Sequence, residues 1–418
     1  MGSMTCCPHM ETPIPVGLSH ADSRIVRQIN MHSVFALLRT KKQLRVSEIA
    51  HLTGLSGATV KYLLQRLMEM RLISPVGEGN STGGRKPTLY ALNVSESVLC
   101  GVEVIIDRIT VGMLNLEGTV LWKYSEEIAK PTPSDLVRVI ERIVRRGVAT
   151  LAISMDHVIG TAVCVPGFVD DKRKTIILDI NMGLKDVALG EMLQNALAMP
   201  VFVIEEANAW LLAEAEYGAI GLPENVVFLL IGSALGRGIG GAIMLNGAIL
   251  SGSRGFSGEI GHMSLDPEGP GCTCGRKGCW EALGSVSSLV EHARPFMKES
   301  AGKGFPALLR ELVTMIESED SRALPLFERF VAIQAEGIAN LIHILNPASV
   351  VIGGEIALFG ELFMEPLRER VLRLVMEPFH AGYSMRLSTL AENNALLGAV
   401  ALLIQKAIAL RQENIEQS

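Results

Sequence analysis

Apolar residues recur at the spacing of one helix face in three consecutive segments near the N-terminus. After a tail over residues 1–20, the first pattern covers residues 25–42. In the second, Ser47 is expected to cap a short helix that ends at Gly54, and Ser56 is expected to cap the third. The apolar side chains that the short helix would bury are Ile49 and Leu52. This order predicts a helix-turn-helix.

The third segment places four apolar residues in one stripe, at positions i, i+3, i+4 and i+7. They are Val60, Leu63, Leu64 and Leu67. The remaining faces carry hydroxyl, amide, aromatic and basic side chains, which are suited to contacts with DNA. With the capping serine, the candidate DNA-binding residues of this helix are Ser56, Thr59, Lys61, Tyr62, Gln65 and Arg66.

Two short strand-like runs, 72–79 and 88–93, follow this helix and are joined by a glycine-rich basic loop. This composition is typical of a winged helix-turn-helix, with residues 82–87 as the wing. Arg85 and Lys86 would supply the positive charge that a narrow minor groove attracts. The alternative is an ordinary charged hairpin in a winged helix that binds protein.

From Val98 the pattern changes to apolar strands that alternate with helices. Strands are expected at 99–105, 109–116, 119–128 and 157–167, with a helix at 133–148. A similar pattern recurs from Val226, with strands at 226–232, 240–250 and 349–356 and several helices between the last two. This is an α/β layout in two similar halves, which suggests two lobes with a ligand cleft between them.

These patterns divide the chain into three structured parts. We expect a winged helix-turn-helix over residues 21–94, a first α/β lobe over 97–217 and a second over 218–394. The C-terminal helix, 395–412, is expected to pack back on the first lobe.

The charge of the chain is unevenly distributed. The whole chain carries −6, but residues 24–93 hold 11 Lys and Arg against 3 Glu, a local charge of +8, which leaves −14 for the rest. The basic end indicates a separate DNA-binding module. With 48% hydrophobic residues the chain can bury substantial cores, yet no apolar run reaches the roughly 18 residues that span a bilayer. We therefore expect a cytoplasmic protein with no membrane partner.

Seven cysteines are an odd count for a disulfide framework, and three of them crowd into one short segment. Together with one histidine they form the pattern H-x9-C-x-C-x4-C, whose members are His262, Cys272, Cys274 and Cys279. One imidazole and three thiolates complete a tetrahedral Zn²⁺ shell with no open position, so the zinc would be structural. Glycines 271, 275 and 278 would permit the tight turns that this spacing needs. The alternative is chance clustering of thiols.

The segments GEIGHM and CTCGRKGCWE resemble the signature of the ROK family (repressor, open reading frame, kinase). Together with the winged helix ending in TGGRKP, they resemble the family's regulators, such as its xylose and N-acetylglucosamine repressors. The resemblance runs from about residue 24 to the last helix. It implies a two-lobed body with the actin/hexokinase-like (ribonuclease H-like) fold, which binds a sugar between the lobes.

The resemblance also implies which residues contact the sugar. Glu259, His262 and Glu281 match the family's sugar contacts, and Gly167 and Asn181 match less closely. His262 would link metal and ligand, with one ring nitrogen on zinc and the other free to bond a hydroxyl. The alternative for these polar positions is surface or turn chemistry.

Two departures from the family's kinases argue against catalysis. Where those kinases carry Asn-Asp-x-Asn, this chain has Glu205 and Glu206 before Asn208, so Glu206 replaces the catalytic aspartate but could still bond a sugar hydroxyl. Where they carry the phosphate-binding Asp-x-Gly-x-Thr, this chain has Glu103, Ile105 and Asp107. Phosphate cradles need glycine for close approach of backbone N–H groups, so ATP should not bind productively.

The sequence therefore predicts a sugar-responsive transcription regulator, most simply a repressor of carbohydrate-utilisation genes. Its partners would be operator DNA, a sugar effector and a second copy in a homodimer, with a tetramer as the alternative. A ROK sugar kinase with a DNA-binding head and a protein-interaction role are the competing hypotheses.

Overall fold

The computed structural model describes residues 23–78, 88–219, 221–232, 238–297, 304–390 and 393–415. The predicted wing, with Arg85 and Lys86, and the tail lie outside the described residues. By their contacts the residues form two compact units. The body is Val94–Ile404, and the N-terminal unit comprises residues up to Asn93 together with those from Gln405 onward.

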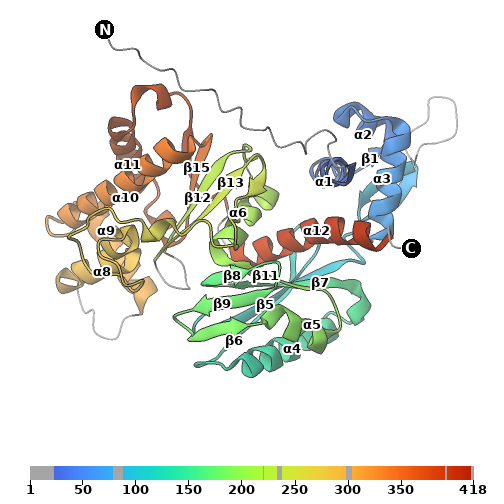
Figure 1. The fold of residues 1–418 in the computed structure, drawn as a ribbon, viewed down its shortest axis with the longest axis horizontal. Helices are drawn as coiled ribbons and strands as arrows, with labels where there is room; N and C mark the ends of the chain where they lie inside the picture. The colour runs from blue at the N-terminus through green and yellow to red at the C-terminus, as the bar shows by residue number, and fades with distance from the viewer. Residues whose placement is uncertain are drawn as a thin grey trace, which may run out of the picture. The chain divides into compact units, whose positions relative to one another are not determined.

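Up to Asn93, the described residues of the N-terminal unit form three helices and a three-stranded antiparallel sheet of order β1-β3-β2 (Figure 1). Its elements are α1 (Ser23–Lys41), β1 (Leu44–Arg45), α2 (Val46–Thr53), α3 (Gly57–Glu69), β2 (Ile73–Glu78) and β3 (Thr88–Leu92). The four apolar residues predicted as the stripe of α3 are all buried, and they pack with buried side chains of α1 and α2. The predicted helix-turn-helix is thereby confirmed.

The turn between α2 and α3 follows the sequence prediction in part. Gly54 ends α2 with a left-handed φ of 71°, and the Ser56 Oγ caps α3 by accepting a hydrogen bond from the Thr59 N–H at 3.1 Å. The cap predicted at Ser47 is wrong. The N-cap is Arg45, two residues earlier, and the Glu48 carboxylate accepts the backbone N–H of Arg45 at 3.0 Å.

Leu52 is also a wrong prediction, since its side chain is 50% exposed. A helix of eight residues has a narrow face toward the core, and Ile49, which is fully buried, fills that face.

The first lobe of the body is built on a five-stranded sheet of order β11-β7-β4-β5-β6. Strands β11, β7 and β4 are parallel, and β5 and β6 continue the sheet antiparallel. A small sheet, β10-β9-β8, follows β7 in the chain. The elements are β4 (Val98–Val104), β5 (Arg108–Leu114), β6 (Val120–Glu127), α4 (Pro133–Thr150), η1 (Met155–His157), β7 (Val158–Val165), β8 (Phe168–Asp170), β9 (Thr175–Asp179), β10 (Leu184–Val187), α5 (Leu189–Leu197), β11 (Val201–Glu205) and α6 (Glu206–Tyr217).

The second lobe repeats this layout with the sheet β16-β15-β12-β13-β14, in which the first three strands are parallel and the last two antiparallel. Its elements are β12 (Val226–Ile231), β13 (Ile239–Leu245), β14 (Ala248–Ile249), η2 (Ile260–His262), α7 (Trp280–Gly284), α8 (Val286–Ala293), η3 (Arg294–Phe296), α9 (Phe305–Glu317), α10 (Leu324–Leu345), β15 (Ser349–Gly353), η4 (Glu355–Phe359), α11 (Glu361–Leu374), η5 (Glu377–Phe379) and β16 (Ser384–Leu387). The two similar α/β halves predicted from the sequence are present.

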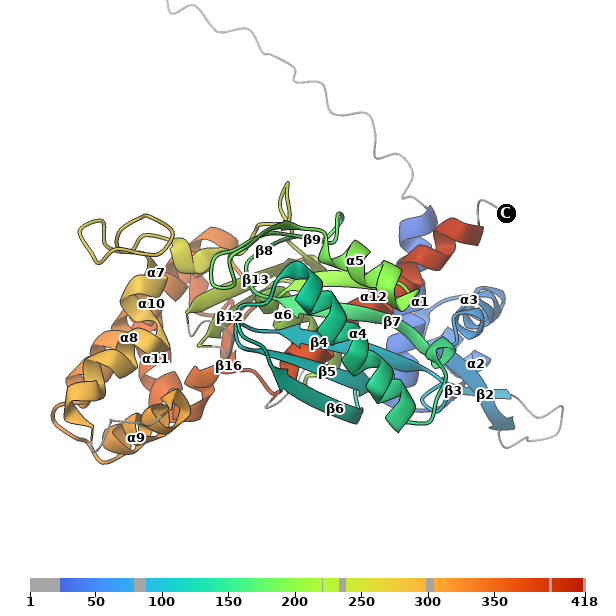
Figure 2. The ribbon, with the colours of Figure 1, turned by 90° about the horizontal axis from the view of Figure 1, so that it is seen from below.

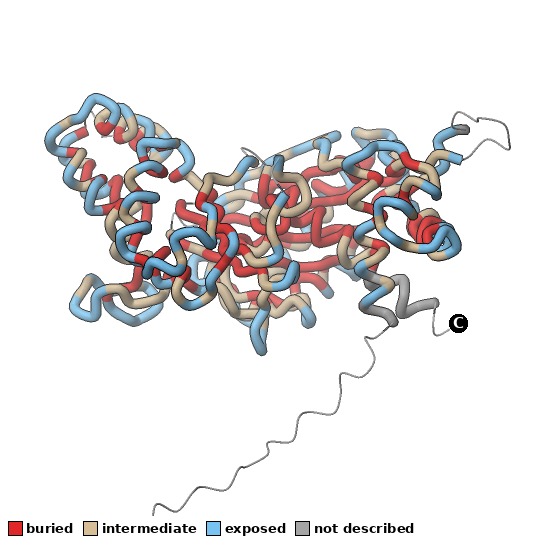
Figure 3. Tube along the Cα trace, turned by 90° about the horizontal axis from the view of Figure 1, so that it is seen from above, coloured by how far each residue is buried: buried red, intermediate tan, exposed pale blue. Residues whose placement is uncertain are grey.

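Each sheet is covered by helices on both faces. In the first lobe, α4 and α5 lie over one face (Figure 2), and alternate residues of β4 pack against them. In the second lobe, α8 to α11 cover one face and α6 contacts the other. Buried residues follow the central strands of the body (Figure 3).

The final helix, α12 (Asn394–Ile415), lies against the first lobe at its beginning. A Cβ at Gly101 of β4 would stand 2.9 Å from the Leu396 carbonyl oxygen, and one at Gly398 would overlap the Ala209 carbonyl of α6. Two glycines therefore allow α12 to lie close to β4 and α6. In the described ranges no helix is both long and apolar enough to cross a membrane.

Candidate functional site

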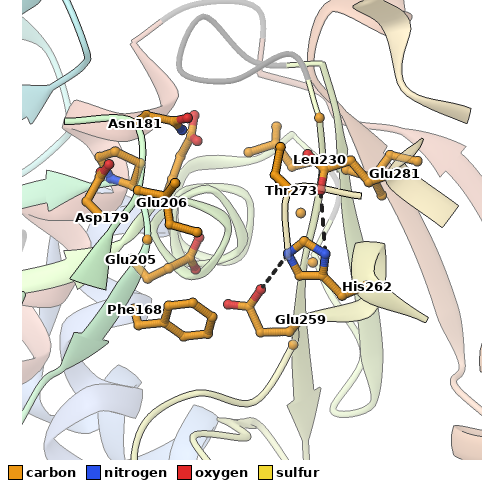
Figure 4. Close-up of a pocket in the computed structure, with 18 of the residues that line it drawn as sticks. Phe168, Asp179, Asn181, Glu205, Glu206, Leu230, Glu259, His262, Thr273 and Glu281 are labelled. Atoms are coloured by element: carbon orange, nitrogen blue, oxygen red, sulfur yellow. Dashed lines mark ion pairs between the residues drawn. The ribbon is translucent and has the colours of Figure 1, made fainter. Parts of the chain in front are cut away.

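A cavity of about 450 Å³ lies in the body and is lined from both lobes (Figure 4). It opens at the carboxyl ends of the parallel strands β7 and β11, the edge at which α/β proteins commonly bind ligands. Its wall contains every residue predicted to contact the sugar. The polar residues of the lining include Asp179, Asn181, Glu205, Glu206, Asn208, Glu259, His262 and Glu281.

His262 lies between two carboxylates of the second lobe (Figure 4). Its Nε2 is 3.8 Å from the Glu259 Oε2, and its Nδ1 is 3.7 Å from the Glu281 Oε2. Burial raises the pKa of both carboxyl groups, and the imidazole partly opposes this shift. Both distances exceed a good hydrogen bond, so oxygens of Glu259 and Glu281 keep the capacity to accept hydroxyl hydrogens.

The junction of β11 and α6 supplies the first lobe's acidic residues. Glu205 is the N-cap of α6, where its carboxylate accepts the backbone N–H groups of Ala207 at 2.7 Å and Asn208 at 2.9 Å. Glu206, which the family resemblance assigns to the kinase-base position, is 8% exposed and lines the cavity. The sequence had assigned no role to Glu205 beyond its replacement of an asparagine, and the structure gives it this capping role.

Burial raises the pKa of Glu205 to about 7 from its ordinary 4.5, and the nearby charge of Glu259 adds to the shift. The folded protein thus holds this proton more tightly than the unfolded chain. The resulting stabilisation is complete below pH 4.5 and is lost as the pH rises to about 7, at about 1.4 kcal/mol per pKa unit.

Glu205→Gln is expected to reduce this pH dependence, because the amide oxygen can still cap α6 but the side chain cannot ionise. Urea unfolding at several pH values should show the free energy of unfolding falling less steeply between pH 4.5 and 7 in the variant than in the wild type. If the free energy of unfolding fell equally steeply with pH in both proteins, the raised pKa of Glu205 would be contradicted.

Gly167 and Asn181 both line the cavity. Gly167 has a φ of +79°, and any Cβ there would overlap the Leu178 carbonyl oxygen. The glycine therefore allows the backbone at residue 167 to lie close to the backbone at Leu178.

Sequence reasoning missed Asp179, which is 1% exposed. Its Oδ1 accepts the Met182 N–H at 2.8 Å, whereas its Oδ2 has no hydrogen-bond partner among the described residues. It also missed Phe168 and Phe256, whose rings meet edge to face at 5.4 Å across the two lobes. The only sequence signal for Asp179 was its place two residues before Asn181.

The predicted metal ligands converge beside this cavity. The ligand atoms of His262, Cys272, Cys274 and Cys279 all lie within 4.8 Å of one another. The Cys272 Sγ is 3.6 Å from the His262 Nδ1, and the Cys274 Sγ is 3.6 Å from the Cys279 Sγ. Bonds of about 2.3 Å to sulfur and about 2.0 Å to nitrogen at tetrahedral angles need separations of about 3.5–3.8 Å, so this donor set fits Zn²⁺.

The polypeptide around these ligands turns as the glycine spacing predicted, with one exception. Gly275 and Gly278 have φ values of +87° and +61°, and a Cβ at Gly278 would overlap the Asp266 carbonyl. Gly271 instead forms an extended bridge with Lys277.

A chain of buried hydrogen bonds fixes α7, the helix that follows the last metal ligand, Cys279. Trp280 is fully buried, and its Nε1 donates to the Gln334 Oε1 at 3.0 Å. The Gln334 Nε2 in turn donates to the Gly284 carbonyl at 2.7 Å. Because Trp280 stands between Cys279 and Glu281, these bonds hold one metal ligand and one cavity carboxylate against α10.

In the N-terminal unit, the candidate DNA-binding residues of α3 differ in availability. Lys61 is exposed and Tyr62 is 39% exposed. The Ser56 and Thr59 hydroxyls bond each other at 2.8 Å within the cap. Arg66 pairs with Glu69 at 2.8 Å and lies over the Tyr62 ring at 5.3 Å, and Gln65 also reaches Glu69, at 3.3 Å.

Comparison with known proteins identifies the family. Residues 99–406 match the ROK family. The chain belongs to that family. Residues 33–77 match the IclR helix-turn-helix domain, so this ROK protein carries a DNA-binding fold at its N-terminus.

The similar proteins include both classes of the ROK family. The xylose repressor of Bacillus subtilis is 26% identical over 384 residues, which cover 92% of this chain and 97% of the repressor. The glucokinase of Thermotoga maritima is 30% identical over 323 residues, which cover 74% of this chain and 98% of the glucokinase. The crystal structure of a ROK family transcriptional regulator, a homolog of the Escherichia coli MLC protein, matches with a TM-score of 0.79 over 94% of this chain and 100% of its own, at 21% identity, which supports the fold.

The hairpin between β4 and β5 is one of the two segments in which the sequence is expected to depart from the ROK kinases. It closes tightly, since the Ile105 N–H donates to the Arg108 carbonyl at 2.8 Å. Ile105 is 2% exposed, whereas Ile106 is 43% exposed. Bulky side chains therefore occupy both of the first two turn positions.

Proposed function

We propose that this ROK protein is a transcription regulator that binds operator DNA through its helix-turn-helix and a sugar effector in the cavity of its body. It would act in the cytoplasm, most simply as a repressor of carbohydrate-utilisation genes. The observation that carries the proposal is the convergence of Glu259, His262 and Glu281 on one cavity in a chain that also has a DNA-binding fold. Similarity to a xylose repressor over 92% of the chain supports it.

Sugar recognition follows from the chemistry of the lining. Carboxylates accept hydrogen bonds from hydroxyls, and an array of them at fixed positions reads the orientation of each hydroxyl. Glu206, Asn181 and Asp179 would face the sugar from the first lobe, and Glu259 and Glu281 from the second. A cavity of about 450 Å³ is large enough for a monosaccharide.

Zinc would act as a structural ion that fixes the sugar site. With the His262 Nδ1 on the metal beside the Cys272 Sγ, the ring is held with its Nε2 toward Glu259 and the cavity. The four protein ligands leave no position open for a reacting water.

We further propose that the body lacks kinase activity. Glu206 extends one methylene beyond an aspartate, and misplacing a base by about an ångström can cost roughly a hundredfold in rate. The β4–β5 turn carries Ile105 and Ile106 where a phosphate would need bare backbone, and Asp107 follows them. Turnover of ATP with any hexose at roughly 1 per second or faster would favour the kinase hypothesis instead.

The proposed coupling is that sugar binding draws the two lobes together and thereby changes how the two heads of a homodimer meet the operator half-sites. Such a change lowers operator affinity because both heads must reach half-sites in register.

The deciding experiment measures operator affinity by fluorescence anisotropy at fixed salt, with and without a panel of monosaccharides that includes xylose. We expect one sugar to weaken operator binding, and Glu281→Gln to shift the required sugar concentration at least about tenfold upward, since one good hydrogen bond to a charged group is worth about 1.5–3 kcal/mol. Glu336→Gln, an exposed carboxylate of α10, is the matched control. An operator affinity that no bound sugar alters would refute the proposal.

A further inference from the structure

Exposed apolar side chains gather on and around α11, which packs beside α10 in the second lobe (Figure 1). Of the sixteen large apolar side chains that are exposed among the described residues, six lie between residues 344 and 376. They belong to the end of α10, to η4, and to α11 and the residues just after it. Single exposed apolar residues are ordinary on a protein surface, whereas a cluster of this kind indicates a contact surface.

Helix α11 has one buried face and one exposed face. The face that it buries carries Phe363, Met364, Leu367 and Val371. On the opposite side, exposed residues recur every three or four positions, which is the spacing of one helix face. Together with one residue of α10 they form the α11 surface, whose members are Ile344, Leu362, Glu365, Leu372, Arg373 and Met376. The proposed sugar site, the metal centre and the DNA-binding helix use none of these residues.

The two ends of the α11 surface are apolar. At its first end Leu362 is 40% exposed. At its second end Leu372 is 46% exposed and Met376, just beyond the helix, is 59% exposed. The Met376 N–H donates to the His343 Nε2 at 3.2 Å, which holds this residue beside the end of α10, where Ile344 is 69% exposed. An apolar cluster and a single leucine therefore stand at opposite ends, with charged residues between them.

The charged residues of the α11 surface are ordered along the helix, acidic before basic. Glu365 is exposed and forms no ion pair with any described residue. The Arg373 side chain is 76% exposed and pairs with Glu369 of the same helix at 3.3 Å. An exposed ion pair within one helix contributes little to stability, so Arg373 remains able to pair with a second carboxylate.

This order makes the α11 surface complementary to a second copy of itself. If two copies of α11 pack antiparallel about a twofold axis at Glu369, residues at equal distances before and after Glu369 face each other. Glu365 lies four positions before Glu369 and Arg373 four positions after it, so each Glu365 faces the Arg373 of the other copy. Leu362 and Met376 lie seven positions before and after, so each leucine faces the apolar cluster of the other copy. The two Glu369 carboxylates meet near the axis, where each is paired with the Arg373 of its own copy.

We propose that the α11 surface joins two copies of this chain through antiparallel pairing of α11. The apolar contacts at both ends remove exposed surface from water, and the two ion pairs in the middle fix the register of the helices. Operator binding by the proposed regulator uses two copies of the chain, and in that respect this inference rests on the proposed function. The test uses neither DNA nor sugar, so each proposal can fail without the other.

Analytical ultracentrifugation of the full-length protein measures the dissociation constant of the dimer. Glu365→Arg and Arg373→Glu each place like charges opposite each other at two points of the interface, and the double variant restores opposite charges. Glu191→Arg on α5 and Lys172→Glu in the first lobe make the same charge reversals at exposed positions away from α11 and are the matched controls. Because all four positions are exposed, the variants are expected to fold, which their circular dichroism spectra check.

We expect each single variant of α11 to raise the dissociation constant at least about tenfold, since like charges brought together across an interface are strongly unfavourable. The double variant should return close to the wild-type value. An equal mixture of the two single variants should form a mixed dimer, because both of its charge contacts join opposite charges. Leu362→Asp, which removes the apolar contact at each end, should weaken the dimer as well.

Three results would overturn the proposal. The first is a wild-type chain that stays monomeric at every concentration. The second is a dimer whose dissociation constant the single variants leave unchanged, because another surface would then join the copies or α11 would serve a different partner. The third is a double variant and a mixture that dimerise as weakly as the single variants, because Glu365 and Arg373 would then not face each other.

Discussion

Cys272→Ser is expected to release about one equivalent of zinc per chain and to weaken sugar binding at least about tenfold. The Cys272 Sγ lies 3.6 Å from the His262 Nδ1, so loss of this thiolate removes the metal contact next to the imidazole that faces the sugar cavity. The apparent binding free energy of structural zinc in small domains is about 10–16 kcal/mol. Much of this binding free energy depends on the presence of all four ligands. Metal analysis of the purified protein and sugar titration measure the two effects.

Glu268→Gln is the control for this substitution, because Glu268 is exposed in the same segment and is not a ligand. It should retain both the metal and the sugar affinity. If Cys272→Ser lost the metal and kept full sugar affinity, the metal would not position the sugar site. If it kept the metal, the four-ligand assignment would be wrong.

Lys61→Glu is expected to lower operator affinity about tenfold or more and to make its salt dependence less steep by about one unit of log affinity per log salt. Lys61 is an exposed cation on α3 in a basic unit, and a Lys contact with a phosphate releases about one counterion. Operator and nonspecific DNA should be affected alike. Fluorescence anisotropy titrations from about 50 to 200 mM salt measure both quantities.

Lys172→Glu makes the same change in net charge at an exposed position of the body and separates local contact from overall charge. It should leave the salt dependence nearly unchanged. Equal losses in the two variants would mean that α3 does not contact DNA at Lys61.

Local patterns predicted much of this fold. The stripe of α3, the cap at Ser56 and the stop at Gly54 each depend on residues within one or two helical turns, and the structure confirms them. Ser47 and Leu52 were wrong because the start of α2 depends on the Glu48 side chain and its buried face on packing by other helices. Neither dependence is visible in apolar spacing.

In the candidate site, too, local sequence predicts some residues and misses those that only the fold brings together. The metal ligands fall within eighteen residues of sequence and could be found from spacing alone. Phe168 and Phe256 meet only because two lobes face each other, and Asp179 enters the cavity through the β8–β9 pairing. A second cavity of the body, of about 720 Å³, draws on residues from Glu103 to Leu396, so no local pattern could indicate it.

Helix α6 borders both cavities, with Glu206 and Asn208 in the wall of one and Trp210 in the wall of the other. A small rotation of this helix would change the walls of both cavities together. A ligand in the first cavity that moved α6 would therefore also change the shape of the second cavity.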